Sequence, residues 1–453
     1  MKRYLVLILV LLFTITMFAG CEELNTKTDE TTDPEIENPD NGAESTNETT
    51  DNDEALKAAE LEIEETVLFD ALPEQDASSF FAALDLIAKS SLKFAEDTLA
   101  GAPNLADKNF VYSPISTWLC YELFLGGITG ELAEELQSKL EPNKFNADDK
   151  LDNIARFVDY YAAKEHSART HNLLLITDKM DFMPEYLEYA ANFRPLLYRM
   201  DMNRTNEVTA AINKLIDEKT AGLIPEFYED DLDEEIVSIL MNITTLDARW
   251  KTEFQPEFTE EEEFHKADGS TVTVKMMNQT VSRSMSYAED EYAQYLIKPY
   301  LGNIEMYLIL PKESVTPEEA LHHFQKNLDK FEFEEYTVEL KLPKFTIESD
   351  YDLKELLSKM GLEKLFSPDY ANQMNRLVNG IDLFIDASRQ AAKIEVFEEG
   401  TKAAAVTDIA VMEASMAPVE DFIALHFNRP FAFSIIEGLG ICLFEGVVMD
   451  PTE

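Results

Sequence analysis

One stretch of this chain is unusual both as core and as surface: Glu398-Glu399-Gly400-Thr401-Lys402-Ala403-Ala404-Ala405-Val406-Thr407. It follows a run with strand character, 392–396, and its glycine permits a turn or a flexible joint. Small residues then alternate, so a strand would present four of them on one face: Thr401, Ala403, Ala405 and Thr407. Small side chains enter between two existing strands without overpacking them. Because a short alanine-rich run alone is more typical of a helix or a linker, the rest of the chain must decide.

The rest of the chain combines helical and extended periodicity. Amphipathic spacing predicts helices over 80–98, 114–124, 130–140, 206–221, 317–328 and 352–360. Runs rich in Val, Ile, Phe and Thr predict strands over 236–246, 271–277, 292–298, 304–310, 337–347, 391–397 and 430–448. Helices come mostly early and strands mostly late, without a regular βαβ alternation. The sequence therefore predicts an α+β fold.

Charge excludes two classes of partner. The chain of 453 residues carries a formal net charge of -50. Nucleic-acid binding needs clustered Lys and Arg, and so does an electrostatic grip on anionic lipid. We therefore expect no nucleic-acid partner, and we interpret most of the carboxylates as solvated surface groups.

The N-terminus has the pattern of a secretion signal. Lys2 and Arg3 precede an apolar run over 4–18, and small residues follow. This run is shorter than a membrane-spanning helix requires, so we interpret residues 1–20 as a signal peptide. The segment Phe18-Ala19-Gly20-Cys21 resembles a prokaryotic lipoprotein box, which implies cleavage before Cys21 and lipidation of its thiol. Simple secretion is the alternative. Either way, we expect an extracytoplasmic protein, held at a membrane or envelope if Cys21 is lipidated.

The composition of the chain changes after Cys21. Residues 22–54 hold thirteen Asp and Glu against one Lys and scarcely any large apolar residue. Such a segment cannot bury enough area to offset its ordering entropy, so 21–78 is predicted to be an acidic disordered tether. Within it, 55–66 has the composition of a short helix. A single folded domain is expected over 79–453.

No catalytic or metal-binding motif emerges. The six histidines lack zinc-ligand spacing, and no Walker loop, dinucleotide fingerprint or nucleophile elbow occurs. Cys120 and Cys442 lie in apolar runs and are expected to be buried free thiols. We therefore predict that the protein is not an enzyme and uses no metal or cofactor.

A series of landmarks resembles the serpin family of serine protease inhibitors, in the form of a prokaryotic lipoprotein. The resemblance spans nearly all of 80–453, and residues 398–405 are similar to the hinge that precedes the family's reactive loop. Further landmarks occur in the family's order: Asn109–Ser116, Gly126–Leu140, Ile212–Ile224, Asn242–Trp250, Phe254–His265, Met276-Met277, Leu342–Phe345, Met360–Leu362 and Phe427–Pro451. Each is weak alone, but their order and spacing make a specific pattern.

The resemblance implies a fold and a mechanism. A serpin has three β-sheets, eight or nine helices and an exposed reactive loop, and it acts as a monomer on an endopeptidase partner. The peptidase, usually a serine and sometimes a cysteine peptidase, cuts the loop and forms an acyl-enzyme. The loop then inserts into the large sheet as a new strand and traps the peptidase. Residues that enter must be small or compatible with a strand, and 401–411 meet this condition, with Lys402 and Asp408 on the outward face.

The resemblance also places the reactive bond. In the family it lies fourteen residues after the hinge glycine, which gives Ala414 followed by Ser415. The loop is longer than in familiar members, so Met412, Glu413 and Met416 remain alternatives. No Lys or Arg occurs from Ala403 to Asn428, which disfavours a trypsin-like target and favours an elastase-like or subtilisin-like peptidase.

Residues resembling two further family features control opening of the sheet. Ser113, Ser116 and Asn242 resemble the shutter, a polar cluster under the opening, where Gln390 stands in place of the family's common histidine. Trp250, Lys344 and Glu398 resemble the breach, the upper end of the sheet where insertion begins. An alternative is a non-inhibitory serpin that acts as a binding or structural module. A lipoprotein hydrolase or solute binder lacks any motif here.

Overall fold

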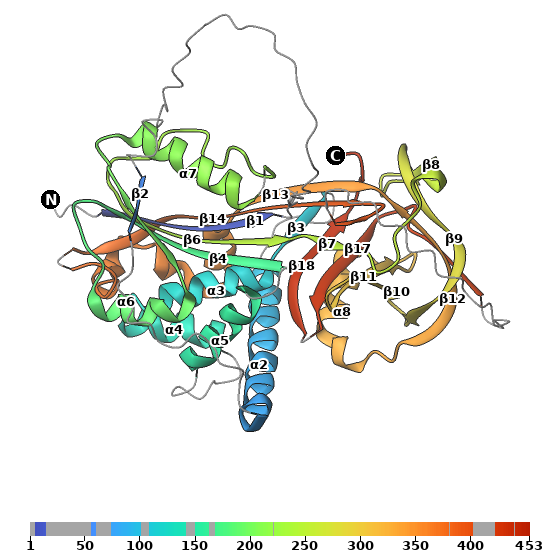
Figure 1. Cartoon of the computed structure of the whole chain (residues 1–453), viewed down its shortest axis with the longest axis horizontal. Coiled ribbons are helices and arrows are strands. Elements are labelled where there is room, and N and C mark those ends of the chain that lie inside the picture. Colours follow the sequence, from blue (N-terminus) through green and yellow to red (C-terminus); the bar gives the residue numbers. More distant parts are fainter. Residues whose placement is uncertain are drawn as a thin grey trace, which may run out of the picture.

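The computed structural model describes residues 5–14, 56–59, 74–100, 108–141, 150–162, 168–220, 222–379, 381–401, 422–438 and 440–453. Predictions for other positions lie outside these residues: those for Cys21, for Ala403 to Ala405, and for the reactive bond at Ala414 and Ser415 with its alternatives. The described part mixes helices with antiparallel and parallel strands (Figure 1). The predicted α+β class is confirmed.

Eight α-helices lie within the described residues, with these bounds: α2 Glu74–Leu99, α3 Pro114–Leu125, α4 Gly130–Leu140, α5 Lys150–Ala162, α6 Pro184–Ala190, α7 Thr205–Lys219, α8 Pro317–Asn327 and α9 Leu353–Leu357. The six helices expected from periodicity all occur, and the prediction for 130–140 matches α4 at both ends. Periodicity did not lead us to α5 or α6. In α5 the signal was present, because Ile154, Phe157 and Val158 follow helical spacing and are buried.

The large sheet is built in the order β2-β5-β4-β6-β1-β14-β15-β7, with β13 beside β14. Its strands have these bounds: β1 Leu5–Thr14, β2 Leu56–Ala59, β4 Ala168–Thr177, β5 Leu196–Met200, β6 Ile236–Leu246, β7 Ala248–Arg249, β13 Phe345–Asp352, β14 Leu383–Phe397 and β15 Gly400–Thr401. Helix α7 covers one face, and α3 to α6 lie below the other (Figure 1). Both faces are therefore covered, which explains why every residue of β6 is buried.

One prediction at the edge of this sheet is wrong. The composition of 55–66 predicted a short helix, but Leu56–Ala59 is strand β2 and pairs antiparallel with β5. The edge of β5 offers unpaired backbone groups, and pairing with them outweighs the intrinsic helical preference of Leu, Lys and Ala, as tertiary context often does.

A second hydrogen-bonded network runs in the order β16-β12-β9-β10-β11-β17-β18-β3, with β8 beside β9. Its strands have these bounds: β3 Phe110–Tyr112, β8 Glu260–His265, β9 Thr271–Glu289, β10 Ala293–Pro299, β11 Ile304–Pro311, β12 Glu334–Pro343, β16 Phe422–His426, β17 Phe431–Glu437 and β18 Ile441–Val448. The long strands β9 and β12 run through two smaller sheets and join them, which gives three sheets in all. The predicted strand over 337–347 is in fact two, β12 and β13, separated at Lys344 after Pro343.

Helix α3 crosses the centre of the molecule and is buried over Pro114–Phe124. Its only carboxylate, Glu122, is fully buried and lies 2.5 Å from Lys150 Nζ of α5, which also pairs with Glu141. Such a buried cluster holds α3 to its neighbours because loss of the lysine would leave a charge without a partner. Cys120 and Cys442 are buried thiols outside any disulfide, as predicted.

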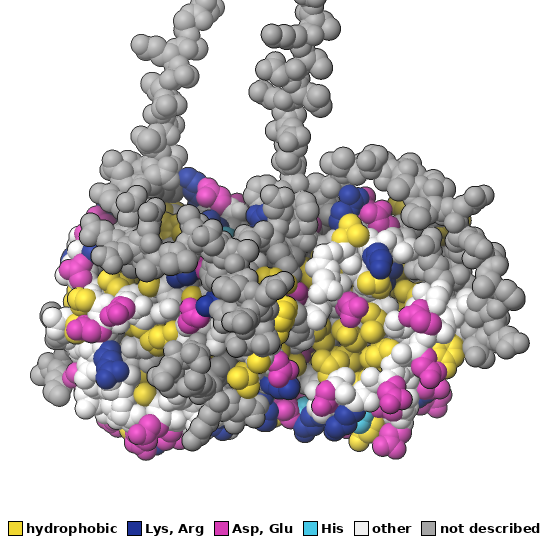
Figure 2. All heavy atoms as spheres, turned by 60° about the horizontal axis from the view of Figure 1, so that its bottom comes forward, with side chains coloured by type: hydrophobic (Ala, Val, Ile, Leu, Met, Phe, Trp, Pro, Cys, Tyr) yellow, Lys and Arg dark blue, Asp and Glu magenta, His cyan; other side chains and the backbone are white. Residues whose placement is uncertain are grey.

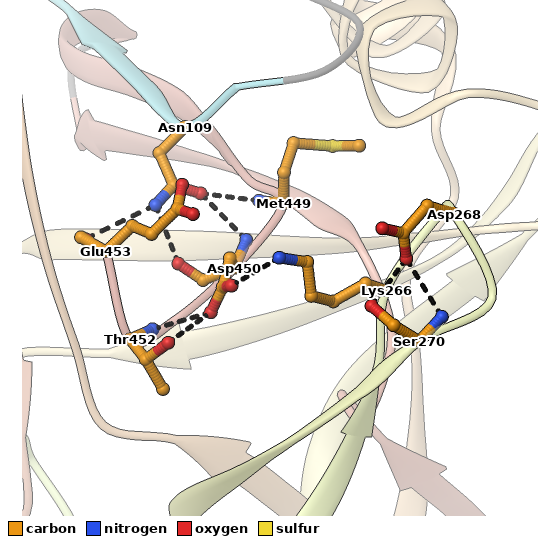
Figure 3. Close-up of polar contacts among 8 residues, drawn as sticks. All are labelled: Asn109, Lys266, Asp268, Ser270, Met449, Asp450, Thr452 and Glu453. Atoms are coloured by element: carbon orange, nitrogen blue, oxygen red, sulfur yellow. Dashed lines mark hydrogen bonds and ion pairs between the residues drawn. The ribbon is translucent and has the colours of Figure 1, made fainter.

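Polar contacts fix the C-terminus beside the large sheet (Figure 3). Asn109 Oδ1 accepts hydrogen bonds from the backbone amides of Met449 and Asp450, at 2.7 and 2.9 Å. Asp450 in turn forms an ion pair of 2.8 Å with Lys266. These contacts tie the closing strand β18 to the segment that leads into β3. On the face shown in Figure 2, acidic side chains are scattered among basic ones, in line with a role as solvated surface groups.

Candidate functional site

Two of the predicted shutter residues, Ser116 and Asn242, come together on α3 and β6. Ser116 Oγ donates to Asn242 Oδ1, and Thr244 Oγ1 donates to the same oxygen at 3.0 Å. The Asn242 amide nitrogen donates to Thr170 Oγ1 and to Asn172 Oδ1, each at 2.8 Å. Thr170 is partly exposed and the other four residues are buried, so these bonds replace ones that water would otherwise make.

Gln390 lies apart from Asn242. Its amide nitrogen donates to Thr117 Oγ1 at 3.0 Å and to the carbonyl oxygen of Ser113 at 3.4 Å. Its side-chain oxygen is buried and has no hydrogen-bond partner among the described residues. An unmet buried acceptor is costly, so this oxygen is available to a donor that approaches it.

Strand β1 separates the two halves of this cluster. It pairs in parallel with β6 on one side and with β14 on the other, and Leu11 is the register partner of both Asn242 and Gln390. Strand spacings of about 4.8 Å on each side hold β6 and β14 roughly two spacings apart. The large sheet is therefore open between β6 and β14, and Leu5–Thr14 fills the opening.

The predicted breach residue Trp250 seals the upper end of the same opening. Its indole is 2% exposed and stacks on Tyr300, with ring centroids 4.0 Å apart. The indole nitrogen donates to the carbonyl oxygen of Phe397 at 3.0 Å, and the Trp250 amide donates to that of Glu399 at 2.9 Å. Trp250 thus links the strand that carries it to the end of β14.

The hinge segment begins inside the sheet. Gly400 and Thr401 form β15, which turns back from β14 and pairs with both β14 and β7. A Cβ atom at position 400 would lie 2.2 Å from the carbonyl oxygen of Ala248, so only glycine fits there. Thr401 is fully buried, and its hydroxyl is hydrogen-bonded to that of Tyr300. The inward position of Thr401 sets the register for the residues that follow.

Lys344 and Glu398 form an ion pair at the turn before the hinge. Lys344 Nζ lies 2.7 Å from Glu398 Oε2, and Thr259 Oγ1 donates to Oε1 at 2.8 Å. Partial burial alone would raise the pKa of Glu398, but the hydrogen bonds and charge of Lys344, with help from Thr259, outweigh it and lower the pKa. The carboxylate is therefore ionised at neutral pH and anchors the end of β14.

Comparison with known proteins agrees with this arrangement. The family model "Serpin (serine protease inhibitor)" matches residues 89–451. The chain belongs to the serpin family. It is 27% identical to alpha-1-antiproteinase of Mus saxicola over 76% of this chain and 84% of that protein. It is 35% identical to human antithrombin-III over 58% of this chain and 57% of that protein.

Solved serpin structures share the fold. The native thermophilic serpin tengpin superposes with a TM-score of 0.72 at 23% identity, covering 87% of this chain and all of that one. Arabidopsis AtSerpin1 in its native stressed conformation gives 0.66 at 23% identity, covering 83% and 99%. Membership confirms the family resemblance, the predicted serpin fold and the prediction that the chain is an inhibitor-family protein rather than an enzyme.

Several residues of this serpin site were not predicted from the sequence. Tyr300 stacks on Trp250 and bonds Thr401, while Thr117 holds Gln390. Thr170 and Asn172 of β4 bind the Asn242 amide. Each lies far along the chain from its partner, so local periodicity carried no signal for it. Within the described residues no group of three side chains suited to a metal ion occurs. No helix there is long and apolar enough to span a bilayer.

The ion pair supports a prediction of modest size. In Lys344→Ala the end of β14 loses one anchor, and we expect the free energy of unfolding at pH 7 to fall by about 1 kcal/mol or less, because Lys344 is partly exposed. The lowered pKa of Glu398 contributes stability above the unfolded pKa, and this is lost as the pH falls through the folded value. The deficit of the variant should therefore disappear as the pH falls through the lowered pKa of Glu398.

Chemical denaturation at a series of pH values from pH 7 downward measures this deficit. Lys275→Ala is the matched control, because its pair with Glu261 is 61% and 65% exposed and should contribute little. Equal deficits for the two variants would contradict a structural role for the Lys344 pair.

Proposed function

We propose that the processed chain is a suicide-type inhibitor of a serine endopeptidase with a small or apolar primary pocket. The peptidase serine attacks the carbonyl carbon of Ala414, the peptide bond to Ser415 breaks, and an acyl-enzyme forms. The loop from Gly400 onward then enters the large sheet between β6 and β14. Its new ladder hydrogen bonds and buried area drive the step.

One observation carries this proposal: the first hinge residues, Gly400 and Thr401, already form a strand of the large sheet, and small residues follow them in the sequence. Thr401 is the register partner of Ala248 on β7 and of Val396 on β14. Continued residue by residue, this register would bring Ala403 opposite Leu246 and Ile394. Both partners are buried apolar residues, and a small side chain between them would crowd the core least.

The same register supports an outward place for the one charge in the hinge. Lys402 would come opposite Asp247 and Glu395, and two acidic neighbours suit a lysine on the outer face. Thr407 would come opposite Asn242 and Gln390, where its hydroxyl could serve the unmet oxygen of Gln390. These positions favour inhibition over a purely structural role, for which the hinge would not need alternating small residues.

The location of the inhibitor is part of the proposal. Removal of residues 1–20 and lipidation at Cys21 would place the serpin outside the cytoplasm. The tether would be the acidic part of segment 21–78, residues 22–54, because strand β2 already belongs to the large sheet. We propose that it acts as a monomer at the membrane or envelope on peptidases that reach it. Intact mass measurement of the processed chain tests the cleavage site and the lipid.

The function is tested by incubating residues 21–453 with a panel of elastase-like, subtilisin-like and trypsin-like peptidases. We expect a covalent complex that survives denaturing electrophoresis with the first two classes. Peptide mapping of the released fragment should place the cut at Ala414, with Met412, Glu413 and Met416 as the competing sites. Cleavage of the loop without a complex, with the peptidase left active, would contradict inhibition and leave the non-inhibitory alternative.

A further inference from the structure

We propose that the N-terminal segment Leu5–Thr14 is an internal plug, which blocks loop insertion until the leader, residues 1–20, is removed. This inference rests on the proposed function, because it concerns the opening that the loop would enter. It predicts that the unprocessed chain is cut by a target peptidase and cannot trap it. Removal of residues 1–20 would then convert a substrate into an inhibitor.

The plug and the hinge occupy the same opening, end to end. Strand β1 runs between β6 and β14 up to Thr14, which is the register partner of Thr245. Strand β15 lies between β14 and β7, the short strand that follows β6 in the chain, and it ends at Thr401, opposite Ala248. Only Leu246 and Asp247 separate these two register positions. The loop therefore cannot advance beyond the first residues of the hinge while β1 is in place.

The sequence of the plug suits this position. Its residues are Leu-Val-Leu-Ile-Leu-Val-Leu-Leu-Phe-Thr, an apolar run without a charge or a proline. A central strand with covered faces on both sides accepts such a run, and every backbone donor remains able to pair. The opening is bordered by buried apolar residues on both covered faces, among them Ile239, Leu240 and Met241 of β6.

Charge at the lower end of the opening favours the same occupant. A cavity of about 630 Å³ there is lined by five carboxylates, Glu229, Asp230, Asp231, Asp233 and Asp386. Its lining includes Ile236 and Ala387, the register partners of Val6 and Ile8. In the sequence, Lys2 and Arg3 come shortly before Leu5, the first residue of β1. The basic start of the leader and the acidic cavity are complementary in charge.

The side-chain oxygen of Gln390, which has no hydrogen-bond partner among the described residues, is consistent with a sheet that is held open by β1. Leu11 stands between Gln390 and Asn242, and a leucine has no side-chain donor to offer this oxygen. When the plug leaves, either closure of β6 on β14 or entry of Thr407 brings a donor to it. A leucine at this position therefore leaves the hydrogen-bonding need of Gln390 unmet.

Disulfide trapping in the full chain tests the position directly. Val10 is the register partner of Met241, so V10C with M241C should cross-link, since paired strands bring Cα atoms within disulfide range. V10C with T245C is the control, because Thr245 lies four positions further along β6, about 13 Å away. We expect cross-linking in the first pair and little in the second, read by mass spectrometry of the linked peptides. Absence of the first cross-link overturns the inference.

A second experiment tests the consequence. The full chain should be cleaved in its loop by a peptidase that residues 21–453 trap, with at least a tenfold lower yield of covalent complex. In the full chain, Leu9→Asp with Leu11→Asp should restore the yield, because a charge inside a central strand is expelled. Leu9→Ile with Leu11→Val is the matched control and should remain blocked.

The two proposals fail in distinguishable ways. If residues 21–453 form no complex with any peptidase, the proposed function fails, while the cross-link still reports whether the plug is present. If the full chain forms complexes as efficiently as residues 21–453, the plug does not block insertion, and the inference is overturned although inhibition stands.

Discussion

Ala403→Arg should turn this serpin from an inhibitor into a substrate of the same peptidase. Continuation of the β15 register brings position 403 opposite Leu246 and Ile394, both fully buried. Insertion would then carry a guanidinium into the covered side of the sheet, which costs several kcal/mol without a partner. A cost of roughly 3 kcal/mol slows insertion about 100-fold, because each 1.4 kcal/mol is a factor of ten. The acyl-enzyme then has time to hydrolyse.

The measurement is the number of serpin molecules consumed for each peptidase molecule inhibited. It should rise by at least tenfold in Ala403→Arg, while the rate of loop cleavage stays unchanged. Lys402→Arg is the matched control, since it places the same side chain on the outward position and should inhibit as the wild type does. If both variants inhibit equally well, the alternation of the hinge has no functional meaning and insertion in this register is wrong.

Glu445→Gln should make the protein more stable at alkaline pH and remove part of its pH dependence. Glu445 of β18 is fully buried, and burial raises its pKa to about 7. Gln325 of α8 donates a hydrogen bond to one of its oxygens, and the other has no partner among the described residues. The folded protein therefore holds a proton on this carboxyl between the unfolded and folded pKa values, where the unfolded chain does not.

The sign follows from this difference in bound protons. Below about pH 4.5 both states are protonated, and the group has no effect on the free energy of unfolding. Between this pH and about pH 7, the unfolded chain has lost the proton while the folded protein keeps it, so the free energy of unfolding falls as the pH rises. The total fall is roughly 3 kcal/mol, and it levels off above pH 8. Glutamine imitates the protonated acid and avoids this loss.

Denaturation midpoints from pH 3.5 to pH 8.5 measure the effect. Wild type and Glu445→Gln should agree below about pH 4 and diverge as the pH rises, with the variant more stable. Glu263→Gln, on the exposed side of β8, is the control and should follow the wild type throughout. Parallel curves for the wild type and Glu445→Gln would show that this carboxyl keeps a charge in the folded protein at no cost.

Local pattern determined much of this serpin. The Val, Ile and Thr content of 236–246 placed β6 at its observed bounds, and the apolar period of 130–140 did so for α4. The small-residue alternation after Gly400 has its first member, Thr401, on the buried side of the sheet. These features depend on one element and its two faces, so residues close in the chain carry them. The apolar run of 4–18 was likewise visible, and its interpretation as a secretion signal remains a prediction.

Tertiary structure alone decided which strands face one another. No local pattern distinguishes Leu5–Thr14 as a leader from Leu5–Thr14 as the strand between β6 and β14, or places Leu11 between Asn242 and Gln390. The helical composition of 55–66 likewise gave way to an edge pairing with β5. The same is true of Tyr300 beneath the hinge and of the carboxyl of Glu445. Strand pairing and burial join residues hundreds of positions apart, and their energy depends on the partner, which the local sequence does not specify.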